Sequence, residues 1–223
     1  MRPATLAIPA ILLVLLAAWL AGRIPAAPAD EAPAGTRWTF DEQEPGAPRG
    51  FRAEAGTWRV IRDDGAPSAP QVLAQTAAND GGTFNLILAE GVSLRDLDLS
   101  VRMRAVGGEI DRGGGLVWRA ADARNYYVAR YNPLESNYRV YYVRDGRRTQ
   151  LASADVETDG TAWHVLRVRM EGDHIECFLD GVRHLDVRDG TFAGAGTVGL
   201  WTKADAQTRF DNLEASPLPG GER

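Results

Sequence analysis

The sequence predicts an all-β protein built as a two-sheet antiparallel sandwich. Residues 163–201 read as short strands separated by tight turns, because apolar Leu166, Val168 and Met170 alternate with arginines before the Glu171-Gly172-Asp173 turn. Asp180-Gly181 provides a two-residue hairpin turn, since both residue types tolerate positive φ. No long amphipathic helical pattern follows residue 35. Alternation also predicts a set of buried core residues: Trp163, Leu166, Val168, Ile175, Leu179 and Leu200.

The strands follow one another along most of the chain. Two terminal strands are expected near 38–43 and 208–215, where they should lie side by side. Between them and before the closing run, strands are expected at 57–62, 71–75, 84–89, 98–106, 115–120, 126–132, 138–144 and 149–152. The remaining boundaries are a Pro/Ala-rich linker at 30–36, one domain at 37–215 and a tail at 216–223.

The first 29 residues carry an export signal or a membrane anchor. Leu6 to Gly22 is an uncharged apolar run of 17 residues, a length between a signal-peptide core and a minimal membrane span. Ala27-Pro28-Ala29 fits a signal-peptidase site, which predicts a mature N-terminus at Asp30 and a periplasmic or extracellular protein. The alternative is an uncleaved anchor, the one case in which a membrane would be a partner.

The net charge argues against a nucleic-acid partner, and the cysteine content excludes an internal disulfide. The chain has a net charge of −5, and removal of residues 1–29 takes away Arg2 and Arg23 but no acid, giving −7. Nucleic acid is therefore not an expected partner. The single cysteine, Cys177, cannot form an internal disulfide, and its position between Ile175 and Leu179 predicts a buried thiol.

The closing run resembles that of concanavalin A-like jelly rolls, which carry the pattern W..l.v...g..i..ylDG......d..f..G.vGl.t. Gly56-Thr57-Trp58-Arg59-Val60, Gly115-Leu116-Val117-Trp118-Arg119 and Asn125-Tyr126-Tyr127 resemble one branch, the 3-keto-disaccharide hydrolase-like domains near family-16 glycoside hydrolases. The resemblance covers nearly all of 37–215. It implies a jelly-roll fold, a saccharide ligand on the concave sheet and hydrolase activity on 3-keto-disaccharides.

The catalytic motif of family-16 enzymes, E-x-D-x-x-E, is incomplete in this chain. Its nearest match is Glu109-Ile110-Asp111-Arg112-Gly113-Gly114, where glycine takes the place of the second glutamate. A polar, glycine-rich connection is the expected structure there. No histidine shows metal-ligand spacing with another, and there is no nucleophile elbow or phosphate loop. The catalytic residues are left unassigned.

A polar sheet face is the better candidate for a ligand site. If strands 98–106, 115–120, 126–132 and 138–144 are neighbours, their polar positions fall on one outer face. Arginine forks and aromatic rings are the side chains that recognise sugar hydroxyls and ring faces. The expected ligand-binding residues are Arg102, Arg104, Arg119, Arg130, Asn132, Arg139 and Tyr141. The resemblance also places a family arginine at Arg119. Simple pairing of these arginines with acids on neighbouring strands is the competing interpretation.

No cofactor is required by any motif, but one structural ion is a candidate. Asp41 and Asp211 each follow a phenylalanine on a terminal strand, so pairing of those strands would bring two carboxylates near each other. Ca²⁺ prefers such oxygen ligands. The alternative is that each aspartate caps a turn or pairs with an arginine. Two functions are consistent with the sequence. The first is an exported carbohydrate-binding jelly roll, with or without hydrolase activity. The second is a non-catalytic laminin-G-like adhesion or scaffold module.

Overall fold

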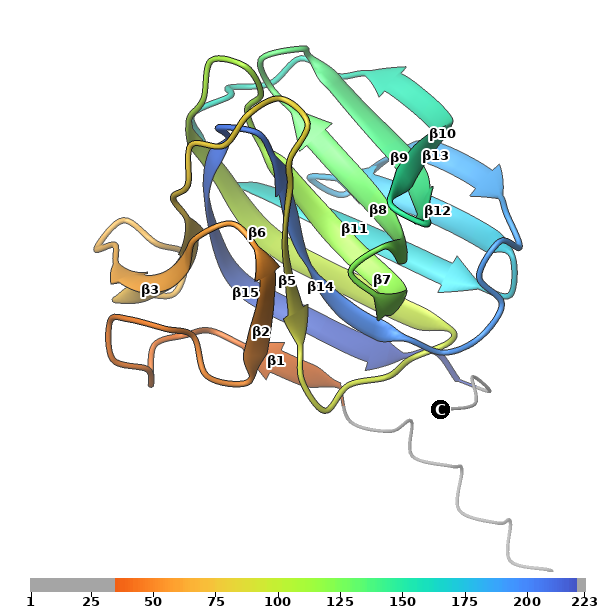
Figure 1. The fold of residues 1–223 in the computed structure, drawn as a ribbon, viewed down its shortest axis with the longest axis horizontal. Helices are drawn as coiled ribbons and strands as arrows, with labels where there is room; N and C mark the ends of the chain where they lie inside the picture. The colour runs from red at the N-terminus through yellow and green to blue at the C-terminus, as the bar shows by residue number, and fades with distance from the viewer. Residues whose placement is uncertain (1–34, 220–223) are drawn as a thin grey trace, which may run out of the picture. The chain divides into compact units, whose positions relative to one another are not determined.

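The computed structural model of the protein describes residues 35–219, and its regular elements there are all β-strands (Figure 1). The signal peptide or anchor expected over 1–29 lies outside these residues. Within the described range, no helix has the length and hydropathy that crossing a membrane requires. The strands form two antiparallel sheets, so the prediction of an all-β, two-sheet sandwich is confirmed.

One sheet has eight strands in the order β13-β12-β11-β6-β15-β4-β3, with β1 also paired to β15. Trp38 of β1 lies opposite Leu213 of β15, so the two terminal strands are side by side as expected (Figure 1). The first of them ends at Trp38, so the expected strand at 38–43 was misplaced and Asp41 lies in the turn that follows. β15 continues two residues into the segment predicted as a tail. The strands are β1 (Thr36–Trp38), β3 (Trp58–Arg62), β4 (Gln71–Gln75), β6 (Leu97–Gly107), β11 (His164–Glu171), β12 (His174–Leu179), β13 (Val182–Arg188) and β15 (Gln207–Pro217).

The other sheet has seven strands in the order β10-β9-β8-β7-β14-β5-β2. Sequence periodicity missed β2, because Phe51 is its one buried residue and the alternation that marks a strand is weak there. The strands are β2 (Phe51–Ala55), β5 (Phe84–Ala89), β7 (Gly114–Asp122), β8 (Asn125–Asn132), β9 (Asn137–Arg144), β10 (Arg147–Asp155) and β14 (Thr197–Lys203).

The main core lies between the two sheets. Trp118 of the seven-stranded sheet donates its indole N–H to the sulfur of Met170 in the eight-stranded sheet, at 3.0 Å. Cys177 is fully buried in this core, as predicted, and burial raises the pKa of its thiol. Five further predicted core residues are confirmed as buried: Leu166, Val168, Ile175, Leu179 and Leu200.

Trp163 was wrongly predicted as a core residue. Successive strand residues face opposite sides, and it is His164 that shares the inward parity of Leu166. The ring of His164 is buried with Nδ1 2.7 Å from Oδ2 of Asp180. The Trp163 side chain faces outward, donates its indole N–H to the carbonyl of Gly65 and lies under the Arg104 guanidinium.

The turns follow the sequence signals. Asp180 and Gly181 both have positive φ, 49° and 81°, and join β12 to β13 as the predicted two-residue hairpin. The Asp180 carboxylate accepts a hydrogen bond from the backbone N–H of Val165, so the turn is also fixed to β11. These contacts hold the β11-β12-β13 meander together.

Candidate functional site

The expected arginine face is divided between the two sheets, which corrects the prediction for Arg102 and Arg104. Their strand, β6, pairs with β11 and β15 in the eight-stranded sheet and not with β7. Both residues therefore lie on the outer side of the other layer. Arg104 is committed there to an ion pair with Asp63 at 2.6 Å, and Arg102 is exposed. The error arose because strand adjacency cannot be read from chain order.

Arg119 also leaves the expected face. The pairing of β7 with β8 is irregular after Trp118, and Arg119 has a positive φ of 46°. Its guanidinium, 1% exposed, donates to the carbonyls of Arg95, Phe192 and Gly172 at 2.7–2.8 Å and meets Asp96 at 3.1 Å. Arg119 is a structural clamp on three loops, with no donor group directed toward the face that carries Arg130.

The other four expected residues share the outer face of the seven-stranded sheet: Arg130, Asn132, Arg139 and Tyr141. This face is concave. Arg148 on β10 is five strand steps from Phe84 on β5, about 24 Å in a flat sheet, yet its guanidinium carbon lies 5.3 Å from the Phe84 ring. The sheet must therefore curl, which brings its distant strands toward each other. We refer to this surface as the concave face.

A second apolar cluster fills the middle of the concave face. Arg148 lies over it, with its guanidinium carbon 4.4 Å from the Tyr141 ring and 5.7 Å from the Trp201 ring. The buried members of the cluster are Leu86, Leu88, Val117, Ala120, Tyr126, Val128, Tyr141, Val143 and Trp201. Because this middle is packed, polar groups collect at the end of the face where β8 finishes.

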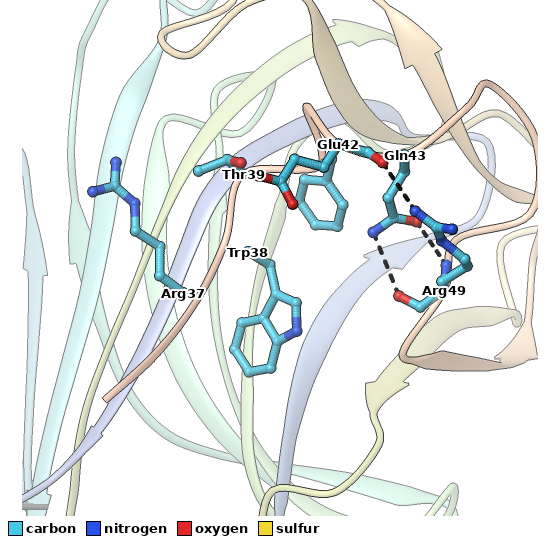
Figure 2. Close-up of a pocket in the computed structure, with 7 residues that line it drawn as sticks. Arg37, Trp38, Thr39, Glu42, Gln43 and Arg49 are labelled. Atoms are coloured by element: carbon cyan, nitrogen blue, oxygen red, sulfur yellow. Dashed lines mark hydrogen bonds between the residues drawn. The ribbon is translucent and has the colours of Figure 1, made fainter. Parts of the chain in front are cut away.

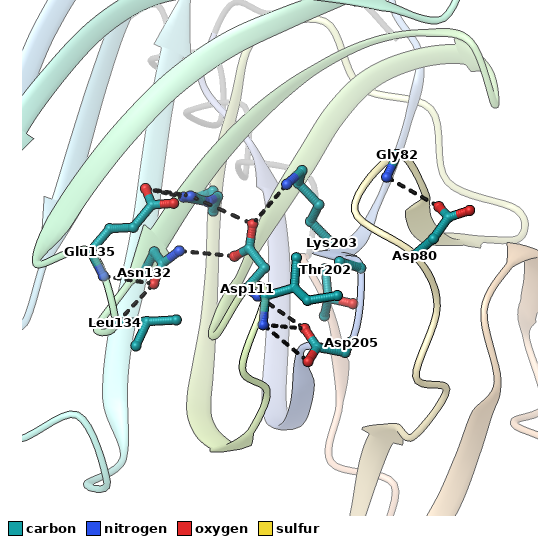
Figure 3. Close-up of polar contacts among 12 residues, drawn as sticks. Asp80, Gly82, Asp111, Asn132, Leu134, Glu135, Thr202, Lys203 and Asp205 are labelled. Carbon is teal, nitrogen blue, oxygen red and sulfur yellow. Dashed lines mark hydrogen bonds and ion pairs between the residues drawn. The ribbon is translucent and has the colours of Figure 1, made fainter.

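The polar groups at that end form a connected cluster (Figure 3). Arg130 Nη2 lies 3.0 Å from Glu135 Oε2 and 3.8 Å from Asp111 Oδ2. Lys203 Nζ meets the same Asp111 oxygen at 3.3 Å, and Asn132 donates its amide to the other oxygen at 2.9 Å. Arg139 pairs with Glu135 at 3.2 Å. We call this set, Asp111, Arg130, Asn132, Glu135, Arg139 and Lys203, the polar cluster.

Local backbone structure puts Asp111 into the cluster. The Asp205 carboxylate accepts hydrogen bonds from the backbone N–H groups of residues 109–111, which fixes this polar connection in place (Figure 3). Gly115 of β7 lies opposite Arg130 on one side and Trp201 on the other. A larger residue is not possible there, because its Cβ would come within 2.0 Å of the carbonyl oxygen of Ala129. The side chains of Arg130 and Trp201 therefore have no side chain of β7 between them at this level.

The electrostatics of the cluster keep its exposed acid ionised. Burial alone would raise the pKa of Glu135, but the Asn137 hydrogen bond and the charges of Arg130 and Arg139 outweigh it and lower the pKa. Burial raises the pKa of Tyr126, a member of the second apolar cluster, to about 12. Glu135 is thus a carboxylate and Tyr126 a neutral phenol at neutral pH.

Several buried polar atoms of the concave face have no hydrogen-bond partner within residues 35–219. Buried polar groups are normally paired, so a set of orphans on one face indicates a place for ligand atoms or water. Those without any other polar contact are Arg130 Nε, Asn137 Oδ1, Tyr141 Oη and Arg148 Nη1. Asp111 Oδ2 has only its ion pairs with Lys203 and Arg130, and Tyr126 Oη and Trp201 Nε1 lie close enough to bond each other. These atoms extend the polar cluster toward Arg148.

Sequence reasoning missed Asp111, Glu135, Arg148 and Lys203. Asp111 was dismissed with the incomplete E-x-D motif, and Glu135 lies in the turn between β8 and β9. Arg148 belongs to a strand that was expected to begin one residue later. Its alternation with Gln150, on the face that Tyr141 shares, is the signal that could have found it.

The two aspartates of the calcium prediction lie near each other. Asp211 is fully buried, and its carboxylate accepts hydrogen bonds from Ser68 and the backbone N–H of Asn212. Burial, and secondarily the charge of Asp41, raise its pKa. Within residues 35–219 neither carboxylate has an arginine or lysine partner within 4 Å. Asp41 Oδ1 accepts a hydrogen bond from the backbone N–H of Gln71, as the capping alternative expects.

A small hollow beside β1 is lined by residues from Arg37 to Arg49, and neither aspartate of the pair is among them (Figure 2). Two of its polar side chains, those of Gln43 and Arg49, are bonded to backbone groups of the same loop. Gln43 accepts a hydrogen bond from the backbone N–H of Arg49, and the Arg49 guanidinium donates to the carbonyl of Glu42. The hollow therefore offers fewer free polar groups than the concave face.

One histidine does join possible metal ligands, which spacing along the sequence did not indicate. His174, Glu176 and Asp186, on the paired strands β12 and β13, hold ligand atoms within 4.8 Å of one another. Arg183 already binds both acids, at 2.6 and 2.8 Å. The group is accounted for as a surface ion-pair network.

Comparison with known proteins identifies the fold. A scan of protein-family models and a search of curated proteins find no match. Solved structures do match: the carbohydrate-binding module CBM66 from Bacillus subtilis has a TM-score of 0.64 at 21% identity, over 75% of this chain and 95% of its own. The chain has a concanavalin A-like jelly-roll fold.

Two enzymes share this jelly-roll fold. The Crh5 transglycosylase has a TM-score of 0.61 at 14% identity, covering 83% of this chain and 85% of its own. A Bacteroides ovatus GH16 protein in complex with a mixed-linkage glucan product has a TM-score of 0.58 at 11% identity, over 81% and 99%. The jelly roll thus accommodates binding modules and enzymes alike, and the narrower resemblance to 3-keto-disaccharide hydrolase-like domains remains a prediction.

Proposed function

We propose that this jelly-roll protein binds a saccharide on its concave face, at the polar cluster. The observation that carries the proposal is the set of unpartnered buried polar atoms beside planar arginine and aromatic side chains. The hydroxyls of a sugar can bond the unpartnered polar atoms and the arginines, and the apolar faces of its ring can stack on the aromatic side chains. The names of the similar structures, a carbohydrate-binding module and a glucan-bound GH16 protein, agree with this ligand class.

Binding without hydrolysis is favoured over catalysis. A glycosidase needs one protonated carboxyl as general acid, and the lowered pKa of Glu135 disfavours that form. Asp111 is held between Arg130 and Lys203.

Hydrolase activity on 3-keto-disaccharides is the second proposal, because two carboxylates, Asp111 and Glu135, meet the same Arg130 nitrogen. Product detection with 3-keto-glycosides, using wild type and Asp111→Asn, tests it. Product formed by the wild type but not by Asp111→Asn would support catalysis that depends on Asp111. Equal amounts of product from both proteins would show that Asp111 is not a catalytic residue.

Binding is tested by a glycan array followed by titration calorimetry. Arg139→Gln and Lys203→Gln each remove a partly exposed cation of the polar cluster. Arg102→Gln, on the outer side of the other sheet, is the matched control. We expect the first two to weaken binding about ten- to a hundredfold, the value of one charged hydrogen bond, and Arg102→Gln to leave it unchanged. A wild type that binds no glycan would favour the laminin-G-like adhesion or scaffold module.

For location we propose export to the periplasm or the extracellular space, with cleavage after Ala29. The apolar run followed by Ala27-Pro28-Ala29 supports it. Mass spectrometry of the exported protein should give an N-terminus at Asp30. Recovery of residues 1–29 on the protein in a membrane fraction would support the anchor instead.

For the acid pair we propose a structural Ca²⁺ held by Asp41 and Asp211. Bound to the native state alone, the ion would stabilise the fold by mass action. Calcium should raise the melting temperature and a chelator should lower it, and Asp211→Asn should abolish the difference. A wild-type melting temperature that is independent of calcium would show that the pair holds no ion.

A further inference from the structure

The charge balance of the concave face bears on the kind of saccharide, an inference that rests on the proposed binding function. Four cations gather there, Arg130, Arg139, Arg148 and Lys203, against two carboxylates of the polar cluster, Asp111 and Glu135. The neighbouring Asp205 is bound by three backbone N–H groups, and Asp155 lies opposite Asn137 at the edge of the same face, so counting both balances the four cations. The balance is uneven in space, because the acids lie beside three of the cations or at the edge of the face. The positive charge without a nearby partner is that of Arg148.

Arg148 is the cation without an acid. The other three each have a carboxylate oxygen within 3.0–3.3 Å, on Glu135 or Asp111. Within residues 35–219, Arg148 has neither an ion pair nor a hydrogen-bond acceptor, and its half-buried guanidinium lies over three aromatic rings instead. Aromatic rings attract a cation but offer its N–H groups no lone pairs in the guanidinium plane. The Arg148 guanidinium is therefore positioned by the three rings, and its N–H groups have no protein acceptor within residues 35–219.

The unpartnered atoms of this face include guanidinium donors that no protein acceptor meets. Arg130 Nε and Arg148 Nη1 can only donate, the Tyr141 hydroxyl can do either, and Asn137 Oδ1 can only accept. A neutral sugar hydroxyl brings one donor for each oxygen. An ionised carboxylate brings acceptors only, and its planar shape matches a guanidinium fork.

We propose that the saccharide is acidic and carries a uronic acid carboxylate, which pairs with Arg148. Neutral rings of the same glycan would contact the remainder of the polar cluster. The face then distinguishes uronate-containing glycans from neutral ones through one unpaired arginine.

Calorimetry with the full chain tests the preference. The probes are oligosaccharides of galacturonic, glucuronic and mannuronic acid, each beside the same oligosaccharide after carboxyl reduction. We expect at least one acidic form to bind ten times more tightly than its reduced form, with an affinity that falls as salt is added. Equal affinities, or binding of neutral glycans only, would overturn this inference and leave the proposed function standing. Binding of no glycan of either kind would overturn both.

A matched pair of variants locates the preference. Arg148→Gln should bring the acidic and reduced forms to equal affinity, whereas Arg147→Gln, which removes an exposed charge from the adjacent position of β10, should keep the full difference. Melting curves check that each variant folds. Arg148→Lys keeps the charge without the fork and should retain only part of the preference, so it answers the question even if Arg148→Gln unfolds. An undiminished preference in a folded Arg148→Gln or Arg148→Lys would exclude Arg148 as the carboxylate partner.

Discussion

Arg119→Ala should destabilise the fold without acting on the ligand directly. The guanidinium, buried at one end of the sandwich, donates to three backbone carbonyls and pairs with Asp96. Burial lowers the pKa of Arg119, but an arginine stays protonated at neutral pH. Truncation leaves three carbonyls and a carboxylate without their partner. Loss of one member of a buried ion pair costs about 3–5 kcal/mol, a large part of the 5–15 kcal/mol typical of a whole domain.

Urea denaturation measures this loss. With a slope of about 2–3 kcal/mol per molar urea, the unfolding midpoint of Arg119→Ala should fall by about 1–2.5 M. Arg147→Ala is the matched control: its side chain is exposed and has no ion pair within residues 35–219, so it should change stability by less than about 0.5 kcal/mol. A loss below about 1 kcal/mol for Arg119→Ala would refute the clamp role.

Three further predictions concern the core and the polar cluster. Leu166→Ala should lower the free energy of unfolding by about 2–5 kcal/mol, since the side chain is fully buried between the sheets; an unchanged melting temperature would place it elsewhere. Cys177 should resist a thiol reagent in the native protein and react once the chain is unfolded in denaturant, whereas rapid native labelling would contradict its burial. The lowered folded pKa of Glu135 means that its ion pairs stabilise the fold above its ordinary value of 4.5 and lose this effect as pH falls through the folded pKa. Glu135→Gln should therefore reduce the acid dependence of the melting temperature, and an identical pH profile would show that the ion pairs contribute nothing.

Most of the fold could be predicted from local patterns because most strands have a clear alternation, β2 being an exception. The alternation around Leu166 and the Asp180-Gly181 turn depend only on neighbours in the chain. The same patterns do not report which strand lies beside which. That is why Arg102 and Arg104 were placed with Arg130, although β6 belongs to the other sheet.

The site was harder to predict because it is assembled from turns and from curvature. Asp111 enters it through a loop that Asp205 fixes, and Arg148 reaches Phe84 only because the sheet curls. Arg119 shows the converse: a local irregularity in β7 turns a residue expected on the face into a buried clamp. Such departures depend on tertiary contacts, which periodicity does not contain.

The most direct test of the central claim is a map of backbone amide chemical shifts during titration with the tightest-binding glycan. Ligand on the concave face should shift amides of β7, β8, β9 and β14, together with the connections that carry Asp111 and Glu135. The amides around Arg102 on β6 and along β11 and β12 should stay in place. Shifts confined to those strands of the eight-stranded sheet would contradict a concave-face site.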